Sequence, residues 1–344
     1  MTNQTKALIV GVGMVADMHA NAINATQGRV ILHAALGRRP DAVDRFAKKH
    51  GVKTSLYTLD EEADLSEIDI AIVTTPPDAR REFIAPFAAQ GIPLLVEKPV
   101  ARTLEEARAF VSACEDAQIP LGIVLQHRMR RSARLLMDRI ADGRLGEIAS
   151  LELRVPWWRD QSYYDSPGRG SFARDGGGVL MTQAIHSLDL LLQFCGPVDT
   201  VQALTSTTAL HTLEAEDFAG AVMRFHSGAV GSVMASVTHF PGGAEEIILN
   251  GTKGSAHLAS DHLRVFYQNG ETEELGKDAA TGGGADPMAF SHAWHQAVIE
   301  DFAQAVAVQR PPAITGRSAL AVHALIDAIT RSASTGQRTT VEPT

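Results

Sequence analysis

The sequence predicts an α/β protein of two domains, in which a doubly wound parallel sheet precedes an α+β domain with an open, largely antiparallel mixed sheet. Short apolar runs alternate with helix-forming segments over residues 1–125, a pattern typical of parallel sheets. Over residues 198–266, strand-length runs follow one another without helices between them, as in antiparallel sheets. The length of 344 residues favours two hydrophobic cores over one. We therefore expect domains over residues 1–125 and 126–344.

The overall composition excludes several classes of function. The formal net charge of −9 at pH 7 argues against non-specific binding to nucleic acid or to an anionic membrane surface. Cys114 and Cys195 lie far apart without a C-x-x-C motif, which favours free thiols in a reducing compartment. The apolar runs are too short for a signal peptide or a membrane-spanning helix. We therefore expect a cytoplasmic protein.

A glycine-rich turn follows the first apolar run, residues 7–10. Its spacing, G-x-G-x-x-A, fits the turn between strand and helix that binds a dinucleotide in Rossmann domains. Gly11 allows the turn, Gly13 lets the backbone approach a pyrophosphate, and Ala16 lets the helix lie close to the strand. The N-terminus of that helix favours the anion. The residues expected to bind the cofactor here are Gly11, Gly13, Met14 and Val15.

The second strand candidate, residues 29–36, ends in a basic turn. An Asp or Glu at this position usually accepts a hydrogen bond from the ribose 2′-hydroxyl of NAD, and the acid is missing here. Gly37 removes the side chain that would repel a 2′-phosphate, and Arg38 and Arg39 are able to bind one through charge-assisted hydrogen bonds. A solvated basic turn before a helix over residues 41–50 is the alternative. We therefore expect NADP to be preferred over NAD.

Three further strand candidates complete the parallel sheet: residues 68–74, 94–96 and 120–125. Thr75 and Pro76 follow the first of them, at the carboxyl end of a parallel strand where ligands bind. We expect both residues to contact the cofactor. Helices are expected over residues 80–90 and 103–116.

Glu97, Lys98 and Pro99 follow the fourth strand candidate, on the side of the sheet where a nucleotide at the glycine turn would extend its nicotinamide. A lysine there is able to hydrogen-bond a substrate oxygen and to hold charge as a hydroxyl becomes a carbonyl. A surface lysine paired with Glu97 is the alternative. We expect Lys98 to be catalytic, and both Glu97 and Lys98 to contact the cofactor.

The second domain begins with a helix and a strand, expected over residues 134–142 and 149–155. A further helix, over residues 179–195, precedes the antiparallel strands. After these strands, a glycine-rich loop is expected at residues 282–284, and two helices around residues 295–308 and 318–333.

Three polar residues recur along the helix expected over residues 179–195. Thr182, His186 and Asp189 are spaced by four and three, so they would share one face of a regular α-helix. Polar groups on an otherwise apolar helix are costly to bury unless they bond to something. A histidine suits proton abstraction from an alcohol, and Asp189 could orient it. A core histidine with satisfied hydrogen bonds is the alternative.

Together, the glycine turn, Glu97-Lys98-Pro99 and the segment from Gly176 to His186 resemble the Gfo/Idh/MocA oxidoreductases, the glucose–fructose oxidoreductase and inositol dehydrogenase group. The resemblance extends in the family's order to residues 188–191, 216–217, 310–312 and 332–336. It implies an N-terminal Rossmann domain and a C-terminal open sheet through which chains associate as homodimers or homotetramers. It also implies a substrate between the domains, typically a sugar, sugar acid, cyclitol or nucleotide sugar. Lys98 and His186 match the family's catalytic lysine and histidine.

The chain departs from the family pattern at two places. Many members have Asp-x-Gly-x-His, whereas this chain has Thr182 where the Asp would be. Threonine is able to hydrogen-bond a hydroxyl but cannot take up a proton. The second departure is at residues 78–81, after the double proline, where many members carry a histidine.

We therefore expect reversible hydride transfer between nicotinamide C4 and a secondary alcohol of a polyhydroxylated substrate. Lys98 would polarise the substrate oxygen, His186 would exchange its proton, and Thr182 and Gln183 would position neighbouring hydroxyls.

Arg128 or Arg159 would suit a substrate carboxylate or phosphate. The aromatic stretch at residues 157–165 would line the pocket, with an oligomer contact as the alternative. The residues expected to bind substrate are Gln126, Arg128, Trp158, Arg159, Tyr163, Thr182, Gln183 and His186, and no metal site is expected.

Two other functions remain as alternatives at this stage. One is a lyase or glycosidase that holds NAD permanently and oxidises its sugar only transiently. The other is a non-catalytic dinucleotide-binding sensor, which the missing Asp at Thr182 motivates.

Overall fold

The computed structural model describes residues 4–59, 65–276, 284 and 291–344. The chain divides into two compact units. The first contains Met1–Ala101, Glu105–Gln126 and His292–Ala319, and the second contains Arg102–Leu104, His127–Ser291 and Leu320–Thr344. A single cut after residue 125 does not separate these units, because His292–Ala319 returns to the first. The loop expected at residues 282–284 lies, except for Gly284, outside the described residues.

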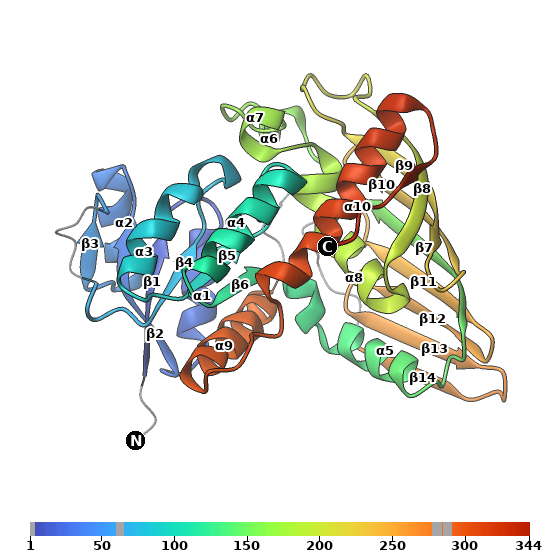
Figure 1. The fold of residues 1–344 in the computed structure, drawn as a ribbon, viewed down its shortest axis with the longest axis horizontal. Coiled ribbons are helices and arrows are strands. Elements are labelled where there is room, and N and C mark those ends of the chain that lie inside the picture. Colours follow the sequence, from blue (N-terminus) through green and yellow to red (C-terminus); the bar gives the residue numbers. More distant parts are fainter. Residues whose placement is uncertain (1–3, 60–64, 277–283, 285–290) are drawn as a thin grey trace. The chain divides into compact units, whose positions relative to one another are not determined.

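The first unit is built on a six-stranded parallel sheet with the order β3-β2-β1-β4-β5-β6 (Figure 1). Its strands are β1 (Thr5–Val10), β2 (Val30–Leu36), β3 (Thr54–Leu56), β4 (Ile70–Val73), β5 (Leu94–Glu97) and β6 (Leu121–Val124). The order reverses between β1 and β4, as in dinucleotide-binding sheets, which confirms the predicted doubly wound fold. β3 has no signal in the sequence, because its three residues are half-buried and form no apolar run.

The central strands of this sheet are apolar and buried. All residues of β4, β5 and β6 are buried, as expected for a parallel sheet covered on both faces. Val10 pairs with Leu36 on one side and with Val73 on the other. The residues that follow these three strands therefore come together at the carboxyl edge of the sheet.

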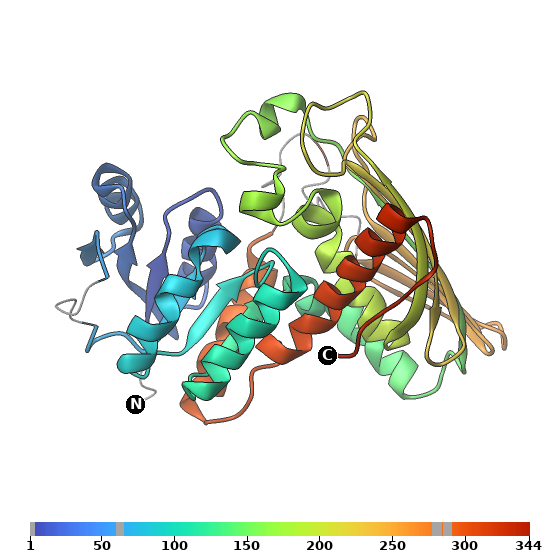
Figure 2. The ribbon, with the colours of Figure 1, turned by 45° about the horizontal axis from the view of Figure 1, so that its top comes forward.

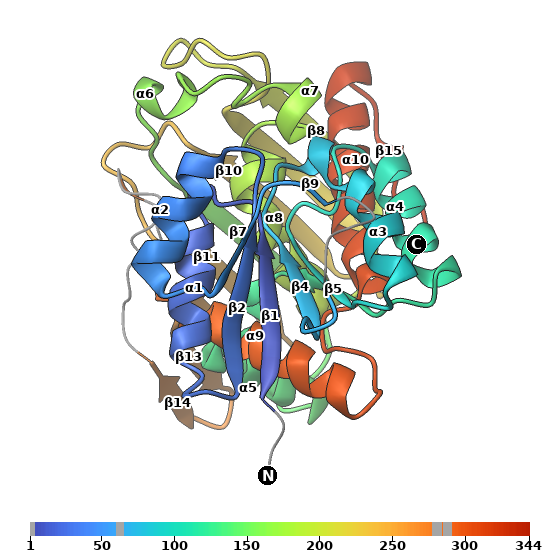
Figure 3. The ribbon, with the colours of Figure 1, turned by 90° about the vertical axis from the view of Figure 1, so that its left-hand side faces the viewer.

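The helices of the first unit are α1 (Ala16–Asn24), α2 (Pro40–His50), α3 (Ile84–Ala89), α4 (Leu104–Asp116) and α9 (Ala293–Ala307). α9 packs against α1, β2 and β6 (Figure 3). The helix expected over residues 80–90 becomes α-helical only at Ile84, after two short 3₁₀ turns. Pro86 explains this late start, because proline lacks the N–H that a helix interior needs and is tolerated in the first turn.

The second unit is built on a nine-stranded mixed sheet with the order β14-β13-β12-β11-β7-β10-β9-β8-β15. Its strands are β7 (Ile148–Pro156), β8 (Val198–Ser206), β9 (Phe218–Phe225), β10 (Val230–Ser236), β11 (Glu246–Gly251), β12 (Gly254–Ala259), β13 (His262–Tyr267), β14 (Thr272–Leu275) and β15 (Thr339–Thr340). β7 and β10 are parallel, and the neighbouring pairs are antiparallel. The predicted open, largely antiparallel mixed sheet is confirmed.

Helices cover one face of this second sheet, and the other face is open (Figure 2). α5 (Arg131–Ala141) contacts β12 and β13, and α8 (Ile185–Cys195) contacts β7. Burial alternates along β9 and β13, so every second side chain points to the open face, which carries both apolar and charged residues. Leu204, Val222 and Phe266 are 60%, 59% and 46% exposed.

The remaining helices of the second unit are α6 (Gln161–Tyr164), α7 (Phe172–Asp175) and most of α10 (Gly316–Thr335). Ser332 on α10 accepts the N–H of Ala203 on β8 at 3.0 Å. Among the residues that the structure describes, no helix combines the length and apolar character needed to cross a membrane.

Candidate active site

A pocket of about 640 Å³ lies at the carboxyl edge of the parallel sheet, where the ends of β1, β2 and β4 meet. Its size and position fit a dinucleotide, because ligands of open α/β sheets bind where the strand order reverses. Of the residues predicted to bind the cofactor, the pocket is lined by Gly11, Gly13, Gly37, Arg38, Arg39, Thr75 and Pro76. The other four lie outside its lining: Met14, which is half-exposed, Val15, the N-cap of α1, and Glu97 and Lys98.

The glycine turn needs one glycine for its own geometry and leaves room for a ligand at the other. Gly11 has a φ of +93°, and a Cβ there would lie 2.9 Å from Cγ2 of Thr75. A Cβ at Gly13 would have no described atom within 4 Å, as expected where the backbone faces a ligand. Thr75 Oγ1 is buried without a hydrogen-bond partner among the described residues. A phosphate or ribose oxygen would satisfy this hydroxyl.

The loop after β2 offers basic rather than acidic side chains to the pocket. Arg38 and Arg39 are both exposed, and Arg39 is the N-cap residue of α2. A Cβ at Gly37 would lie 3.1 Å from Cγ2 of Val43. A side chain at residue 37 would therefore crowd Val43 on α2, because the helix already packs closely on this loop.

Glu97 lies beneath the lysine turn. Its side chain is buried and accepts a hydrogen bond from Nε2 of His19 at 2.8 Å, and Nε2 of His295 lies 3.7 Å from the same oxygen. Burial would raise the pKa of Glu97, but hydrogen bonds from these two histidines hold it well below its usual value. The second carboxylate oxygen accepts the backbone N–H of Lys98 at 3.1 Å. Glu97 thus orders the turn that carries Lys98.

His19, Glu97 and His295 are also side chains of the kind that bind metal ions. Their ligand atoms lie within 4.8 Å of one another. The 2.8 Å separation between His19 Nε2 and Glu97 Oε1 is that of a hydrogen bond. We therefore assign these three side chains to a buried hydrogen-bond network.

Arg80 joins the loop after β4 to the turn after β5. Its buried guanidinium donates to the carbonyl oxygen of Thr75 at 2.8 Å. It also donates to the carbonyl oxygens of Glu97 and Pro99, on either side of Lys98. Burial lowers the pKa of Arg80 to about 10, which leaves it charged at neutral pH. Sequence reasoning misses this role, because an arginine in an expected helix usually lies on the surface.

In the second unit, the helix that carries His186 begins at a glycine-rich segment held by Glu216. The two carboxylate oxygens of Glu216 accept the N–H groups of Gly178 and Leu180, each at 3.0 Å. Its carbonyl oxygen accepts the N–H of Val179 at 2.8 Å. Burial raises the pKa of Glu216, although the N–H groups of Gly178 and Leu180 oppose the shift by donating to its carboxylate. Glu216 therefore anchors the start of the helix.

We expect Gly178→Ala to destabilise the second unit by about 3 kcal/mol or more. A Cβ at residue 178 would lie 1.8 Å from the carbonyl oxygen of Glu216, so the backbone would have to move away from its acceptors. Urea unfolding followed by circular dichroism measures the change. Gly177→Ala is the control, because its nearest contact is a side-chain atom at 3.2 Å. Equal stability of the two variants would contradict this close approach.

The first turn of this helix differs from the regular α-helix expected over residues 179–195. Leu180–Ala184 form a π-helical turn, and α8 begins only at Ile185. Such single wide turns are rare and occur often at functional sites. The turn lies where Glu216 holds the preceding N–H groups, a constraint that local periodicity does not reveal.

Thr182 and Gln183 lie side by side on the π-helical turn. Thr182 Oγ1 donates to the carbonyl oxygen of Gly178 at 2.6 Å and also contacts Oε1 of Gln183. Gln183 is buried, and its Nε2 has no hydrogen-bond partner among the described residues. A hydroxyl has a single proton, so Thr182 is able to accept from a further group but not to donate to it.

Asp189 has a different partner from the one expected. Both of its oxygens accept from the guanidinium of Arg128, at 2.7 Å from Nε and 2.6 Å from Nη2. Both side chains are buried, and burial raises the pKa of Asp189 although Arg128 opposes the shift. Asp189, expected to orient His186, and Arg128, expected to bind a substrate anion, are thus bonded to each other within the second unit.

His186 is buried at the start of α8 and packs against a second histidine. The ring centroids of His186 and His127 are 4.6 Å apart, with 30° between the ring planes. His127 belongs to the 3₁₀ turn Gln126–Met129. Sequence reasoning singles out its neighbours Gln126 and Arg128 but misses His127, whose only signal is its place directly after the last parallel strand. Gln126 belongs to the first unit, is buried, and leaves its Oε1 without a described partner.

The aromatic stretch contains a buried arginine. Arg159 donates to the carbonyl oxygens of Trp158 at 2.6 Å and Gly284 at 2.7 Å. Its guanidinium lies 5.5 Å from the ring centre of Tyr163, and burial lowers the pKa of Arg159. Arg159, which is expected to bind a substrate anion, thus also joins the aromatic stretch to Gly284. Trp158 is half-buried, with its ring 5.3 Å from that of Phe240.

Comparison with known families decides the assignment. Residues 5–123 match the model of the oxidoreductase family with an NAD-binding Rossmann fold, and residues 133–257 match the GFO/IDH/MocA C-terminal domain. The chain belongs to the Gfo/Idh/MocA oxidoreductase family. The predicted resemblance is thus confirmed, with both parts of the family architecture present in one chain.

Several relatives of this Gfo/Idh/MocA protein match it over nearly the whole length. The rhizopine catabolism protein MocA of Rhizobium meliloti is 27% identical, over 94% of this chain and 93% of that protein. The 1,5-anhydro-D-fructose reductase of Ensifer adhaerens is 26% identical, over 97% and 98%. The WlbA dehydrogenase of Bordetella pertussis, solved with NADH and UDP-GlcNAcA, is 27% identical with a TM-score of 0.84, covering 99% of this chain and 100% of that one.

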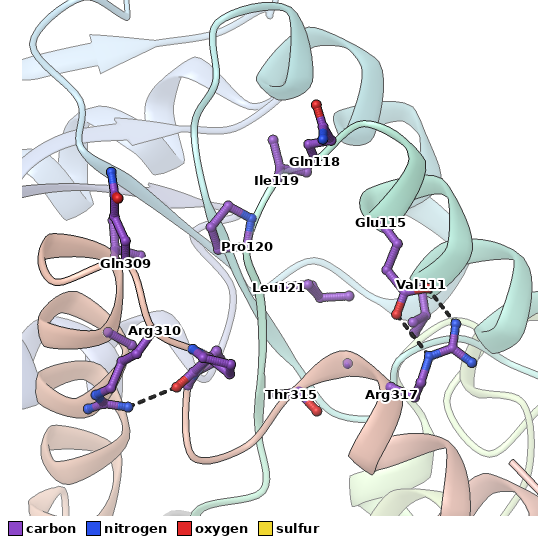
Figure 4. A pocket seen from close by; sticks show the side chains of 15 residues that line it. Val111, Glu115, Gln118, Ile119, Pro120, Leu121, Gln309, Arg310, Thr315 and Arg317 are labelled. Carbon is purple, nitrogen blue, oxygen red and sulfur yellow. Dashed lines mark hydrogen bonds and ion pairs between the residues drawn. The ribbon is translucent and has the colours of Figure 1, made fainter.

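A second pocket in this Gfo/Idh/MocA protein lies away from the predicted site residues (Figure 4). It has a volume of about 450 Å³ and lies at the amino end of β6, opposite the carboxyl edge where the dinucleotide pocket opens. Its lining is largely apolar, and the ion pair between Arg317 and Glu115 lies on it. None of the predicted site residues lines this pocket.

Proposed function

We propose that this protein is an NAD(P)-dependent dehydrogenase that transfers a hydride between nicotinamide and a secondary alcohol or ketone of a sugar, sugar acid or cyclitol. The observation that carries the proposal is the position of Lys98. Arg80 and Glu97 hold its backbone at the carboxyl end of β5, in the same unit as the dinucleotide pocket. The substrate class is supported by relatives named as an inositol 2-dehydrogenase and a 1,5-anhydro-D-fructose reductase.

Lys98 and His186 take complementary roles in the proposed oxidation. Lys98 Nζ donates a hydrogen bond to the substrate oxygen and stabilises the negative charge that develops on it. His186 accepts the hydroxyl proton on its imidazole ring. The bound dinucleotide supplies the hydride acceptor. Both side chains must reach the same substrate carbon–oxygen bond for this mechanism to operate.

Thr182 and Gln183 are proposed to bind neighbouring hydroxyls of the substrate. The hydroxyl proton of Thr182 is directed to the oxygens of Gly178 and Gln183, so Thr182 is proposed to accept a hydrogen bond from the substrate and not to donate one. Because Thr182 takes the place of the Asp found in many members, His186 has to take up the proton without help from a carboxylate there. The remaining proposed substrate contacts are Gln126, Trp158 and Tyr163.

A panel of sugars, sugar acids and cyclitols, followed by the absorbance of reduced nicotinamide, tests this function. We expect turnover with at least one member, and a fall of about 10²–10³-fold in Lys98→Met, because a hydrogen-bond donor to the developing charge is lost. Lys49→Met is the matched control, since Lys49 is exposed and pairs with Asp17 on the surface of the same unit. Undiminished turnover in Lys98→Met would remove the mechanism.

We also propose that NADP is preferred over NAD. Arg38 and Arg39 are exposed beside the pocket, and no acid follows β2. We expect Arg38→Ala to weaken NADPH binding by about 10–100-fold, the value of one hydrogen bond to a charged group, with NADH binding unchanged. Isothermal titration calorimetry measures both constants, and Arg45→Ala on α2 is the control. Tighter binding of NADH than NADPH by the wild type would contradict the proposed preference.

A second copy of the chain is the proposed partner for the open face of the nine-stranded sheet. Leu204, Val222 and Phe266 are exposed there, and apolar side chains on an open sheet favour association. Light scattering coupled to size exclusion would show a homodimer or homotetramer, and Val222→Lys would dissociate it. A monomer at micromolar concentration would contradict this proposal.

A cytoplasmic location is proposed from the two thiols. Cys114 and Cys195 are free, and burial raises the pKa of each to about 12. Thiols of this kind stay reduced and unreactive, which suits a reducing compartment.

The substrate panel also distinguishes the two alternatives. A lyase or glycosidase with permanently held NAD would keep its dinucleotide through purification and release product without accumulating reduced nicotinamide. A sensor would bind the dinucleotide and turn over no substrate. Thr182 is the feature that motivates the second alternative, since it leaves one acidic group fewer near His186.

A further inference from the structure

A chain of three buried side chains leads to the ring of His186 inside the second unit. Glu245 Oε1 lies 2.6 Å from Arg130 Nη1, and Arg130 Nη2 lies 2.5 Å from Nε2 of His127. The ring of His127 then packs on that of His186 at 4.6 Å. Arg130 is 1% exposed and also donates to the carbonyl oxygen of Ser260 at 2.9 Å. The chain joins the turn after β6 and the start of α5 to the segment before β11.

The chemistry of arginine fixes the protonation state of His127. A guanidinium has only donors, so Arg130 donates and Nε2 of His127 accepts. The proton of His127 is therefore on Nδ1, and the ring is neutral. A second proton on His127 would remove this acceptor and place a cation against Arg130.

The two charged side chains that follow His127 in this network have no net charge together. Arg130 is cationic, Glu245 is anionic, and both are buried in contact with each other. The charges of the nearby Arg128–Asp189 pair also cancel each other. The carboxylate of Glu216 accepts hydrogen bonds from backbone N–H groups at the start of the π-helical turn.

The elements packed against α8 direct apolar or small groups inward. On α5 these are Ser132, Ala133 and Leu136, while its charged residues are exposed or half-buried. On β7 they are Leu151, Leu153 and Val155, while Glu152 and Arg154 are exposed. Within this unit, a proton taken up by His186 therefore meets no uncompensated cation on these elements.

We propose that His127 is a positioning residue for His186. Glu245, Arg130 and His127 together form a support of zero net charge behind the His186 ring, so the ring is able to take up a proton without repulsion from this group and without moving. The proposal rests on the proposed function, in which His186 accepts the substrate proton. His127 holds the ring by its face, and the Arg130–Glu245 pair fixes the tautomer of His127 without adding net charge.

Two single substitutions in the same ion pair test the charge balance. Glu245→Gln leaves Arg130 uncompensated, which opposes a cation on His186, and should move the acidic limb of the kcat/KM profile to lower pH. Arg130→Met leaves Glu245 uncompensated and should move the limb to higher pH. The acidic limb should shift by about one pH unit in each variant. This is the effect expected for a unit charge separated from His186 by the ring of His127, at an effective dielectric constant near 20. Movement in the same direction, or none, would overturn the proposal.

The double variant Arg130→Met/Glu245→Gln removes both charges and is the matched control. Its acidic limb should stay within about 0.3 pH units of the wild type, and it remains testable if a single variant with one buried charge fails to fold. His127→Phe keeps a flat ring and His127→Ala does not. We expect Phe to retain at least ten times the kcat of Ala with KM changed little, and equal losses would overturn the positioning role.

Histidine NMR gives a readout that does not require turnover. In protein labelled with ¹⁵N-histidine and assigned through His186→Asn, the His127 signals should show the neutral Nδ1–H tautomer down to the pH at which the protein unfolds. The His186 titration midpoint should move in opposite directions in Glu245→Gln and Arg130→Met. If the wild type turns over no substrate but these shifts occur, the proposed function fails while the support stands. A His127 that titrates to a cation in the folded protein would overturn the support itself.

Discussion

His186→Asn is expected to lower kcat for alcohol oxidation by about 10²–10⁴-fold, the usual contribution of a positioned base. Asparagine keeps a polar side chain of similar size but cannot take up the substrate proton. The initial rate of nicotinamide reduction at saturating cofactor and substrate measures this loss. The effect should fall on kcat, because proton transfer contributes to the transition state and not to ground-state binding.

Three measurements separate this loss from damage to the fold. NADPH should bind His186→Asn as it binds the wild type, since every residue lining the dinucleotide pocket lies in the first unit. The urea midpoint should change little. His226→Asn, at an exposed histidine after β9, should leave kcat unchanged. A fall of less than tenfold in His186→Asn would show that another group takes the proton.

Asp189→Asn is expected to lower the free energy of unfolding by about 3–5 kcal/mol, because it leaves the buried guanidinium of Arg128 without a counter-charge. The pair is bidentate and almost fully buried. Arg128→Met should cost a similar amount, since it leaves the carboxylate unpaired in the same place. Urea unfolding followed by tryptophan fluorescence measures both losses.

The double variant Arg128→Met/Asp189→Leu should recover much of the lost stability, because removing both buried charges avoids their desolvation. This recovery distinguishes a structural pair from a catalytic one. If Asp189→Asn keeps the stability of the wild type but loses activity, Asp189 acts by orienting His186 instead of by stabilising the fold.

The sequence predicts most of the strands because two different patterns of apolar residues mark the two sheets. Continuous apolar runs predict the buried parallel strands, and strand-length runs without helices predict the antiparallel sheet. β3 escapes because three half-buried residues carry no periodicity. The late start of α3 could be foreseen from Pro86, but the π-helical turn could not, since Glu216 holds it from 36 or more residues away.

The return of α9 to the first unit is equally hidden from local pattern. Its residues follow the second sheet in the chain, and nothing in their composition says which core they join. The contact of α9 with α1 decides it, and His295 on α9 completes the network around Glu97. Long-range packing of this kind becomes visible only in the fold.

In the candidate site, the positions of the motifs are predictable from the sequence, but the hydrogen-bond and ion-pair partners of individual side chains are not. The glycine turn and the residues after β2 and β4 line one pocket because parallel strands bring their carboxyl ends together. Arg128 and Asp189 are 61 residues apart, and His19 and Glu97 are 78 apart. No spacing rule pairs such residues, so the ion pair between Arg128 and Asp189 is not predictable from the sequence.

The hydrogen bonds that Arg80 donates to the turn around Lys98 affect the entropy of ligand binding. Because the carbonyl groups on both sides of the lysine are tied down during folding, the backbone entropy of that turn is lost before any ligand arrives. In the proposed mechanism, the backbone of this turn therefore needs no ordering when the substrate binds, and a larger share of the binding energy remains for the reacting bond. Preorganisation of this kind would, in the proposed mechanism, make Arg80 a determinant of rate through the backbone that it holds around Lys98.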